Sequence, residues 1–340
     1  MPSKVRILLG PQIYAFIQSR QTRQQSITDF CRFVSRLSSG HYCLVSSIDM
    51  PELPEVETIR RDLSALLGKK IISLKILSPK SASHTAAFFE KSLLGNKLIK
   101  IDRRGKLLIL SMSNGLFLLI HLKMTGQLIY QSKGVKVVGG HSLSSGNYEK
   151  SVGGKLPNKH TRAIFNFSGG GELFFNDIRK FGYLKLVTKE ELEKILKNNY
   201  GPEPLSKEFT AEKLKQIFKT RKTNIKAVLL NQKLISGLGN IYVDEALYAA
   251  KIKPTRPANK VKPEEIVRLV KETDKLIKKA IEYRGTTFSN YVDSKGKKGN
   301  FSQYLKVYGR AGEKCLVCGN TIKKMKLAGR GTHYCQNCQK

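Results

Sequence analysis

The sequence predicts an α+β multi-domain protein with an N-terminal β-sandwich with flanking helices, a helical domain and a small C-terminal ribbon. Runs of alternating and β-branched residues fill most of the chain between residues 70 and 187. Helical periodicity dominates residues 209–283, and two Cys-x-x-Cys pairs close the chain. We expect an extension over 1–49, a catalytic sandwich over 50–190, a linker over 191–205, a helical domain over 206–300 and the ribbon over 301–340.

The charge of the chain points to a polyanionic partner. The sequence carries 61 basic against 26 acidic residues, a formal net charge of +35, and its 40% hydrophobic residues suffice for a folded core. Nucleic acid is therefore the leading candidate partner, although a ribosome-associated or merely basic protein fits the same composition. The sequence has no apolar run long enough to span a membrane. The chain between Met50 and Lys314 lacks cysteine, which argues against a disulfide-stapled secreted fold.

Residues 1–49 differ in character from the rest of the chain and fit none of the expected domains. They contain six Lys/Arg and two acids, and Gly10-Pro11-Gln12 interrupts their apolar stretch, which disfavours a secretory signal. We favour a start codon assigned too far upstream over a genuine targeting or regulatory leader.

The lead segment Met50-Pro51-Glu52-Leu53-Pro54-Glu55 has the composition of a chain start. Two prolines exclude a helix interior, and an amphipathic helix with acidic residues in its first turn is expected directly after Pro54. If translation begins at Met50 and the methionine is removed, Pro51 becomes a terminal secondary amine beside Glu52. Such an amine has a reference pKa of about 7.7–8.0 and can form an iminium with a sugar aldehyde carbon. The alternative is a plain helix-leading segment.

The β-rich region continues with strands and hairpins. Asn114-Gly115 and Gly169-Gly170-Gly171 mark two hairpin turns. The strands are expected at residues 70–77, within 97–130, and at 161–167, 172–175 and 183–187. Residues 131–158, rich in Gly, Ser and Lys, are expected to form a long exposed loop.

The helical region follows a Gly-Pro-Glu-Pro linker at residues 201–204. Helices are expected at 209–220, 225–230, 243–250 and 263–283. The turn Ser236-Gly237-Leu238-Gly239-Asn240 opens one of them, and its backbone N–H groups suit a phosphate. Taken alone, the two glycines fit an ordinary helix connection equally well.

The cysteine pairs at the C-terminal end are the most specific motif. Cys315, Cys318, Cys335 and Cys338 have the spacing of one structural zinc ion on two knuckles, and a redox dithiol pair is the lesser alternative. From residue 295 onward Glu313 is the single acidic residue, so this ribbon is expected to face a polyanion.

The string Met-Pro-Glu-Leu-Pro-Glu-Val-Glu-Thr-Ile-Arg-Arg from Met50 strongly resembles the amino terminus of the bacterial formamidopyrimidine-DNA glycosylases, and the resemblance continues to Lys340. It implies a helix–two-turn–helix domain around Asn240. It also implies a nucleophilic Pro51, proton transfer by Glu52, a phosphate-side Lys106 in Arg103-Arg104-Gly105-Lys106, and Arg330 at the lesion phosphates.

The resemblance also implies a set of DNA-binding residues. An enzyme that acts on a base inside a duplex must extrude it, and apolar wedges with an arginine fill the gap. Met124, Arg179 and Phe181 match that wedge, whereas singly Met124 and Phe181 would be core residues. Lys123 and Lys180 depart from the usual neighbours, and Thr161 stands where an acid often follows the histidine. The remaining implied DNA contacts are His160, Lys222 and Asn240, and residues 285–299 resemble the loop that closes over the base.

The implied function is base-excision repair of oxidised purines with AP lyase β,δ-elimination. Leu53 and the Arg179/Phe181 wedge favour the purine branch over the endonuclease VIII-like pyrimidine branch. A non-catalytic damaged-DNA-binding protein is the alternative if residues 1–49 are retained. The expected partner is double-stranded DNA with oxidised bases, bound by a monomer that acts at the nucleoid in a bacterial cytoplasm.

Overall fold

The computed structural model describes residues 50–340 except 134, 141–147 and 287–300. One compact unit spans Ile48–Lys340 and contains all of these residues. None of the helices in the described ranges combines the length and the apolar character that a membrane span requires.

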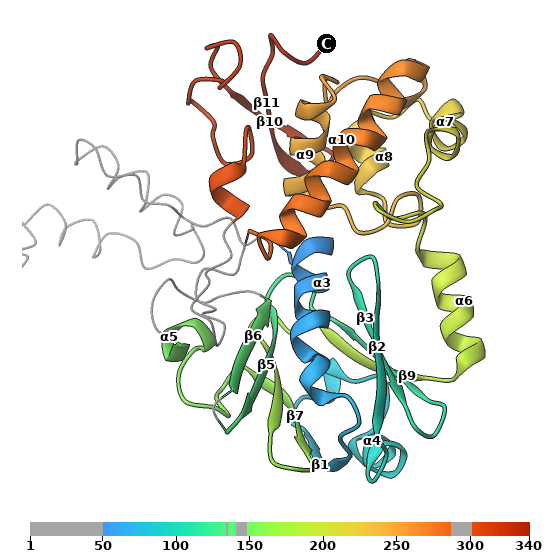
Figure 1. The fold of residues 1–340 in the computed structure, drawn as a ribbon, viewed down its shortest axis with the longest axis vertical. Coiled ribbons are helices and arrows are strands. Elements are labelled where there is room, and N and C mark those ends of the chain that lie inside the picture. Colours follow the sequence, from blue (N-terminus) through green and yellow to red (C-terminus); the bar gives the residue numbers. More distant parts are fainter. Residues whose placement is uncertain (1–49, 134, 141–147, 287–300) are drawn as a thin grey trace, which may run out of the picture. The chain divides into compact units, whose positions relative to one another are not determined.

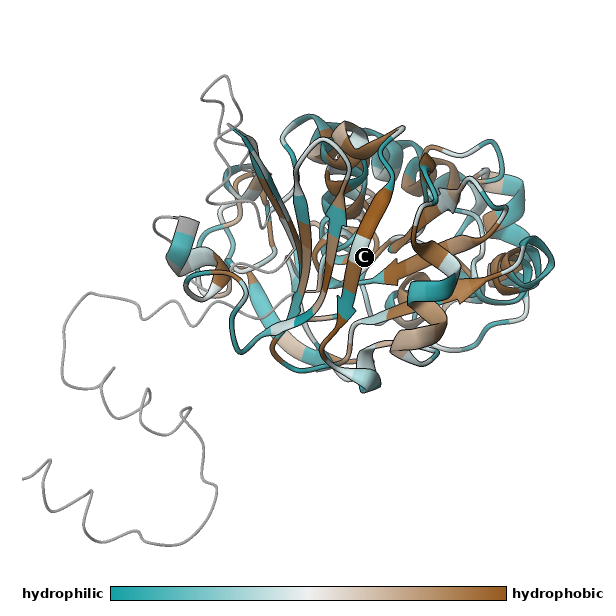
Figure 2. Ribbon diagram, turned by 90° about the horizontal axis from the view of Figure 1, so that it is seen from below, coloured by the Kyte–Doolittle hydropathy of each residue, from teal (hydrophilic) through white to brown (hydrophobic). Residues whose placement is uncertain are grey.

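Two antiparallel sheets form the predicted β-sandwich (Figure 1). The five-stranded sheet has the order β1 (Ile71–Ile76), β7 (Thr161–Phe167), β8 (Glu172–Asp177), β5 (Gly126–Ser132) and β6 (Val135–Gly140). The four-stranded sheet has the order β2 (Leu98–Arg104), β3 (Leu107–Met112), β4 (Phe117–His121) and β9 (Tyr183–Val187). Leu110 of the second sheet and Phe165 and Phe175 of the first share one buried core. In Figure 2 brown, hydrophobic segments lie along both strands and helices and alternate with teal, hydrophilic ones.

Helix α3 (Leu53–Asp62) begins where the prolines allow it and joins two cores. Glu52 and Glu55 form a capping box at its start, and Pro54 sits in its first turn. Val56 and Ile59 are buried in the sandwich core, whereas Leu53 belongs to the core of the helical domain. The 3₁₀ turn η1 (Leu63–Leu66) continues the helix, which Figure 1 shows between the two sheets.

The helical domain contains the four helices that the periodicity predicts. They are α7 (Ala211–Lys219), α8 (Ile225–Leu230), α9 (Asn240–Ala249) and α10 (Pro263–Glu282). Leu214, Leu247 and Leu269 lie in their common core. Threonine or asparagine caps α7 and α8, since the side chains of Thr210 and Asn224 accept hydrogen bonds from backbone N–H groups in the first turn.

Two sequence expectations are wrong in part. Residues 131–158 are not one exposed loop, because β6 pairs with β5 and α5 (Tyr148–Val152) ends on the fully buried Val152. The expected linker 191–205 is helical in its first half, where α6 (Lys189–Asn199) begins with a capping box at Thr188. Helix α4 (Ala86–Leu93) lies in a segment for which the sequence suggested no element.

The C-terminal ribbon is a hairpin of β10 (Lys323–Leu327) and β11 (Arg330–Tyr334). A buried ion pair fixes it to the helical domain. Lys226 Nζ lies 2.6 Å from Asp244 Oδ1, and both side chains are fully buried. The Asp244 carboxylate also accepts the backbone N–H of His333 at 2.8 Å, and Lys226 donates to the carbonyl of Gly331 at 3.3 Å.

Candidate active site

Glu52 links the lead segment to the helical domain. Its buried carboxylate accepts the backbone N–H of Gly239 at 2.6 Å and that of Ile241 at 2.9 Å, at the positive end of α9. The expectation that these N–H groups are open to a phosphate is therefore wrong, because a carboxylate of the chain already uses them. The side-chain amide of Asn240 donates instead to the Gly331 carbonyl at 3.0 Å.

Lys106 faces Glu52 across Gly239. A Cβ built on Gly239 would lie 2.6 Å from Lys106 Nζ and 2.5 Å from Glu52 Oε1, so the glycine is required for this close approach. Lys106 is 3% exposed. Burial lowers its pKa, and the charges of Glu52 and Glu55 oppose that shift.

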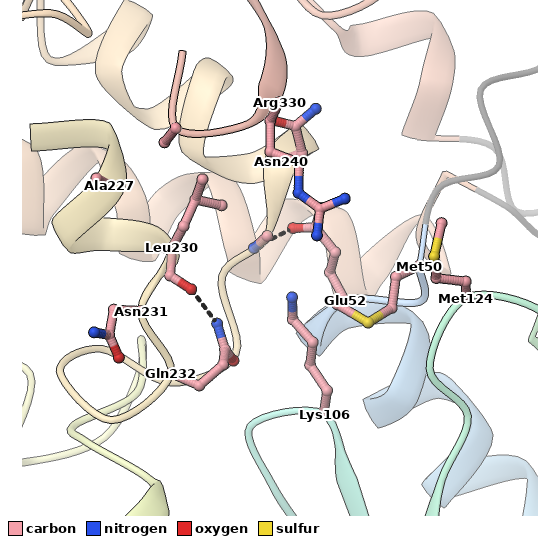
Figure 3. A pocket seen from close by; sticks show the side chains of 12 residues that line it. Met50, Glu52, Lys106, Met124, Ala227, Leu230, Asn231, Gln232, Asn240 and Arg330 are labelled. Carbon is pink, nitrogen blue, oxygen red and sulfur yellow. Dashed lines mark hydrogen bonds between the residues drawn. The ribbon is translucent and has the colours of Figure 1, made fainter. Parts of the chain in front are cut away.

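A cavity of about 530 Å³ opens between the lead segment, the β2–β3 turn, α9 and the ribbon hairpin. Figure 3 shows Lys106 and Arg330 approaching Glu52 from opposite sides, with Met50 and Met124 at another side. The predicted site residues that line it are Glu52, Lys106, Met124, Asn240 and Arg330. Residues far apart in the sequence therefore line one cavity, which contains the acidic Glu52 and the basic Lys106 and Arg330.

Pro51 is buried between Met50, which lines the cavity, and Glu52. In this chain its ring nitrogen is bonded to the carbonyl carbon of Met50 and is an amide. An amide nitrogen has no available lone pair, because the pair is delocalised into the carbonyl. With residues 1–49 attached, the Pro51 nitrogen could therefore not act as a nucleophile, although the lead segment lines the cavity.

The β2–β3 turn that carries Lys106 is fixed by charged groups. Glu203 accepts the N–H of Gly105 at 2.6 Å and a hydrogen bond from Arg103 at 3.0 Å, and Arg103 also reaches Glu57 at 3.3 Å. Arg103 therefore ties this turn both to the linker and to α3.

Glu57 is a strongly ionised member of the same network. Burial raises its pKa, but hydrogen bonds from Arg60 and Arg61 and the charge of Arg103 outweigh that effect and lower the pKa to about 2. Glu57 therefore stays ionised throughout the neutral and mildly acidic range.

The three predicted wedge residues lie together on two neighbouring turns. Arg179 Nη1 lies 3.3 Å from the Met124 sulfur, and the Arg179 guanidinium carbon is 5.5 Å from the centre of the Phe181 ring. Phe181 is 56% exposed, so its ring is accessible from outside the chain.

The other predicted DNA contacts lie outside the cavity lining. His160 precedes β7, and its carbonyl accepts the N–H of Asp177 at 2.9 Å. Partial burial and the neighbouring Lys159 and Arg162 lower the pKa of His160. Lys222 is exposed between α7 and α8. Most of the predicted closing loop at 285–299 lies outside the described residues.

Sequence reasoning missed Glu55 as a bridging residue. Its carboxylate accepts the N–H of Glu52 at 3.0 Å, the hydroxyl of Tyr242 at 2.9 Å and the N–H of Thr286 at 2.8 Å. The spacing Glu52-x-x-Glu55 signals the capping box. The contacts with Tyr242 and Thr286 are tertiary, and no local pattern indicates them.

The four cysteines fit a tetrahedral zinc ion. Their sulfur atoms all lie within 4.8 Å of one another, with Cys315–Cys338 at 3.8 Å and Cys318–Cys335 at 3.5 Å. A tetrahedron with Zn–S bonds of about 2.3 Å places its sulfur atoms roughly 3.8 Å apart. Four thiolates leave no open position, so such an ion holds the ribbon and contributes no reaction step.

Comparisons with known proteins agree along the chain. Three family models match: "Formamidopyrimidine-DNA glycosylase N-terminal domain" over 50–184, "Formamidopyrimidine-DNA glycosylase H2TH domain" over 200–292, and "Zinc finger found in FPG and IleRS" over 312–340. The formamidopyrimidine-DNA glycosylase of Pelotomaculum thermopropionicum is 42% identical over 294 residues, which cover 86% of this chain and 99% of that protein. That of Carboxydothermus hydrogenoformans is 41% identical, with 86% and 100% covered.

Solved structures show the same likeness. Lactococcus lactis Fpg in complex with an abasic site containing DNA has a TM-score of 0.73 and 35% identity, covering 85% of this chain and 100% of that one. The complex of the wild-type Lactococcus lactis Fpg with an N7-benzyl-Fapy-dG containing DNA has a TM-score of 0.73 and 36% identity at the same coverage.

Proposed function

Because the chain belongs to the formamidopyrimidine-DNA glycosylase family, it is a base-excision repair glycosylase, and we propose that it works through a covalent bond between Pro51 and the damaged nucleotide's sugar. The observation that carries this proposal is the cavity at the lead segment, where Glu52 and Lys106 meet across Gly239. A nucleophile at the start of that segment would attack beside a carboxylate and a buried amine.

The proposed active form begins at Pro51. The first family model starts to match at Met50, and this chain covers 99–100% of the length of the relatives described above with about 86% of its own. Removal of everything before Pro51 would turn its amide into a secondary amine, with a reference pKa of about 7.7–8.0 for a terminal amine. Roughly a tenth to a sixth of such an amine is unprotonated at pH 7, far more than for a lysine side chain with its reference pKa of about 10.4.

The reaction is balanced without an external oxidant or reductant. The Pro51 nitrogen uses its lone pair to attack C1′ of the deoxyribose, and the N-glycosidic bond breaks with its electrons on the departing base, which takes up a proton. The Pro51 nitrogen then loses its own proton, and its lone pair expels O4′, which receives a proton, so that the sugar ring opens and a cationic iminium forms. A base removes the C2′ proton, and the C2′–H electrons pass to the iminium to give an enamine. The enamine then expels the 3′ phosphate, which regenerates a conjugated iminium. A second elimination releases the 5′ phosphate, and water hydrolyses the adduct.

The buried groups suit separate tasks in that sequence. Glu52 lies beside Pro51 and is placed to deliver and take up protons at O4′ and C2′. Lys106, whose pKa burial lowers, provides an amine at the lesion phosphate, and Arg330 faces the cavity from the ribbon as a fixed positive charge.

The wedge defines the substrate class. Met124, Arg179 and Phe181 form one cluster on two turns, which suits the gap left by an extruded base in a duplex. Together with Leu53, this cluster favours oxidised purines such as 8-oxoguanine and formamidopyrimidines. We expect the protein to bind such DNA as a monomer and, because the relatives named above are bacterial, to act at the nucleoid in a bacterial cytoplasm.

Borohydride trapping tests the nucleophile. The full chain and a version that begins at Pro51 are incubated with an 8-oxoguanine:cytosine duplex and reduced, and the covalent adduct is measured by denaturing gel and mass spectrometry. We expect an adduct at Pro51 in the shortened protein alone, because the full chain presents an amide. The full chain serves as the matched control, since it carries the same cavity.

Three outcomes contradict parts of the proposal. An active full chain with residues 1–49 still attached would exclude Pro51 as the nucleophile. A shortened protein that binds the duplex without an adduct or strand cleavage would favour a non-catalytic damaged-DNA-binding protein. Preferential cleavage at oxidised pyrimidines would assign the chain to the endonuclease VIII-like branch.

A further inference from the structure

The two wedge turns meet at one buried carboxylate. Met124 lies on the turn between β4 and β5, while Arg179 and Phe181 lie on the turn between β8 and β9. Asp177 ends β8 and is fully buried between these turns. The assignment that follows rests on the proposed wedge function of these two turns.

Asp177 makes hydrogen bonds to both turns through its side chain. Its Oδ1 accepts the hydroxyl of Thr125, the residue after Met124, and the N–H of Arg179 at 3.2 Å. Its Oδ2 accepts the N–H of Gly182, the residue after Phe181, at 2.7 Å. The N–H of Arg179 also reaches the Thr125 hydroxyl oxygen at 3.0 Å, so Thr125 donates to one partner and accepts from the other.

The backbone of Asp177 extends the connection. Its N–H donates to the carbonyl of His160 at 2.9 Å, and its carbonyl accepts Arg162 Nε at 2.8 Å. Gly182 has no room for a side chain, because a Cβ there would lie 3.1 Å from Asp177 Oδ2 and 2.8 Å from the Phe175 ring. Asp177 is therefore hydrogen-bonded directly to His160 and Arg179, and to the residues that follow Met124 and Phe181. The predicted DNA-contacting residues among these are His160, Met124, Arg179 and Phe181.

The conformation of the turns needs such support. Lys123 and Lys180, each beside a wedge residue, have φ values of +52° and +58°. Residues other than glycine rarely adopt this region, and they remain there only where the surrounding structure fixes the backbone. The hydrogen bonds that Asp177 accepts from Thr125, Arg179 and Gly182 hold both turns in this conformation.

We propose that Asp177, with Thr125, is a positioning residue that locks the two turns together, so that Met124, Arg179 and Phe181 enter the duplex as one rigid wedge. It touches neither the substrate nor the reacting atoms. Its effect is to hold the inserted geometry in advance, which avoids ordering the two turns separately when DNA binds.

Wedge insertion is tested with the full chain and an uncleavable duplex that carries a tetrahydrofuran site opposite 2-aminopurine. Binding is followed by fluorescence anisotropy and insertion by 2-aminopurine fluorescence, neither of which needs a free Pro51. For Asp177→Asn we expect the equilibrium for insertion to fall on the order of 10- to 100-fold, because an amide replaces a charged acceptor. Overall affinity should fall only a few-fold, because the phosphate contacts are intact.

Thr125 supplies a gentler pair of variants in case Asp177→Asn folds poorly. Thr125→Val removes the hydroxyl with little change of shape and should lose insertion, whereas Thr125→Ser keeps the hydroxyl and should restore it. Ser73→Ala is the control for general loss of a hydrogen bond, since it removes the 2.6 Å contact with Asn166 elsewhere in the sandwich. It should match the wild type.

The outcomes distinguish a failure of the positioning role of Asp177 and Thr125 from a failure of the wedge itself. A normal wild-type signal with unchanged insertion in Asp177→Asn and Thr125→Val overturns the positioning role alone. A wild-type chain that binds the duplex without any change in 2-aminopurine fluorescence overturns the wedge itself, and the positioning role with it.

Discussion

Breaking the buried ion pair between Lys226 and Asp244 should destabilise the helical domain strongly. The two charged atoms lie 2.6 Å apart, and both side chains are fully buried. Asp244→Asn leaves the ammonium of Lys226 in the interior with a neutral partner. The loss also reaches the ribbon, because Asp244 accepts the N–H of His333.

The expected cost is about 3–5 kcal/mol, the range for removing one partner from a buried pair. This is a large part of a total stability of about 5–15 kcal/mol. It corresponds to a decrease in Tm of roughly 6–20 °C, at about 2–4 °C per kcal/mol for a domain of this size. The double variant Lys226→Met/Asp244→Leu should recover most of the loss, because two apolar side chains leave no buried charge.

Urea unfolding of the zinc-loaded protein, followed by circular dichroism, measures these differences. The exposed pair Lys275–Glu272 at 3.1 Å is the matched control, and Lys275→Met should change the free energy of unfolding by less than about 0.5 kcal/mol. A loss below about 1 kcal/mol for Asp244→Asn would refute the reasoning. So would a double variant as unstable as the single one.

Three further changes probe the site and its supports. Gly239→Ala should abolish glycosylase activity, measured by cleavage of an 8-oxoguanine duplex with the Pro51-initiated protein, because the new Cβ collides with Glu52 and Lys106; unchanged cleavage would contradict the geometry. The ion pairs of Glu57, whose pKa is lowered to about 2, stabilise the fold above pH 4.5, and this contribution is lost as the pH falls toward 2. Glu57→Gln should therefore flatten the decrease in unfolding free energy between pH 6 and 3, measured in urea, and an equally steep decrease would contradict it. Cys335→Ser should lower the zinc content from one ion per chain, measured by mass spectrometry, and reduce thermal stability; full zinc retention would contradict the four-thiolate site.

Local sequence patterns predicted the bounds of several elements. The alternation of residues 161–167 and 183–187 matches β7 and β9 at both ends, and residues 225–230 match α8. Strand β6 escaped prediction because its glycines and lysine resemble a loop. It forms because it pairs with β5, and Gly139 lets it approach α3, where a Cβ would lie 2.3 Å from Ile59.

The site was predictable as a set of residues but not as a set of contacts. The sequence identifies Glu52, Lys106 and Arg330 through resemblance, and the structure places all three at one cavity. The bond from the Gly239 N–H to Glu52 joins residues far apart in the chain, and no spacing rule reveals it. Asp177 lies two residues before Arg179 in the sequence, but its proposed role depends on contact with Thr125, 52 residues earlier.

The two hydrogen bonds that the Glu52 carboxylate accepts at the start of α9 also affect how variants of this site are interpreted. The same carboxylate is the proposed proton carrier and also connects α3 to the start of α9 by hydrogen bonds. Replacing Glu52 would remove both the hydrogen bonds to Gly239 and Ile241 and the proposed proton carrier. A lower activity would therefore not by itself show which of the two was responsible. A neutral side chain at position 52 that still accepts hydrogen bonds from the Gly239 and Ile241 N–H groups would separate the proposed proton transfer from the structural role.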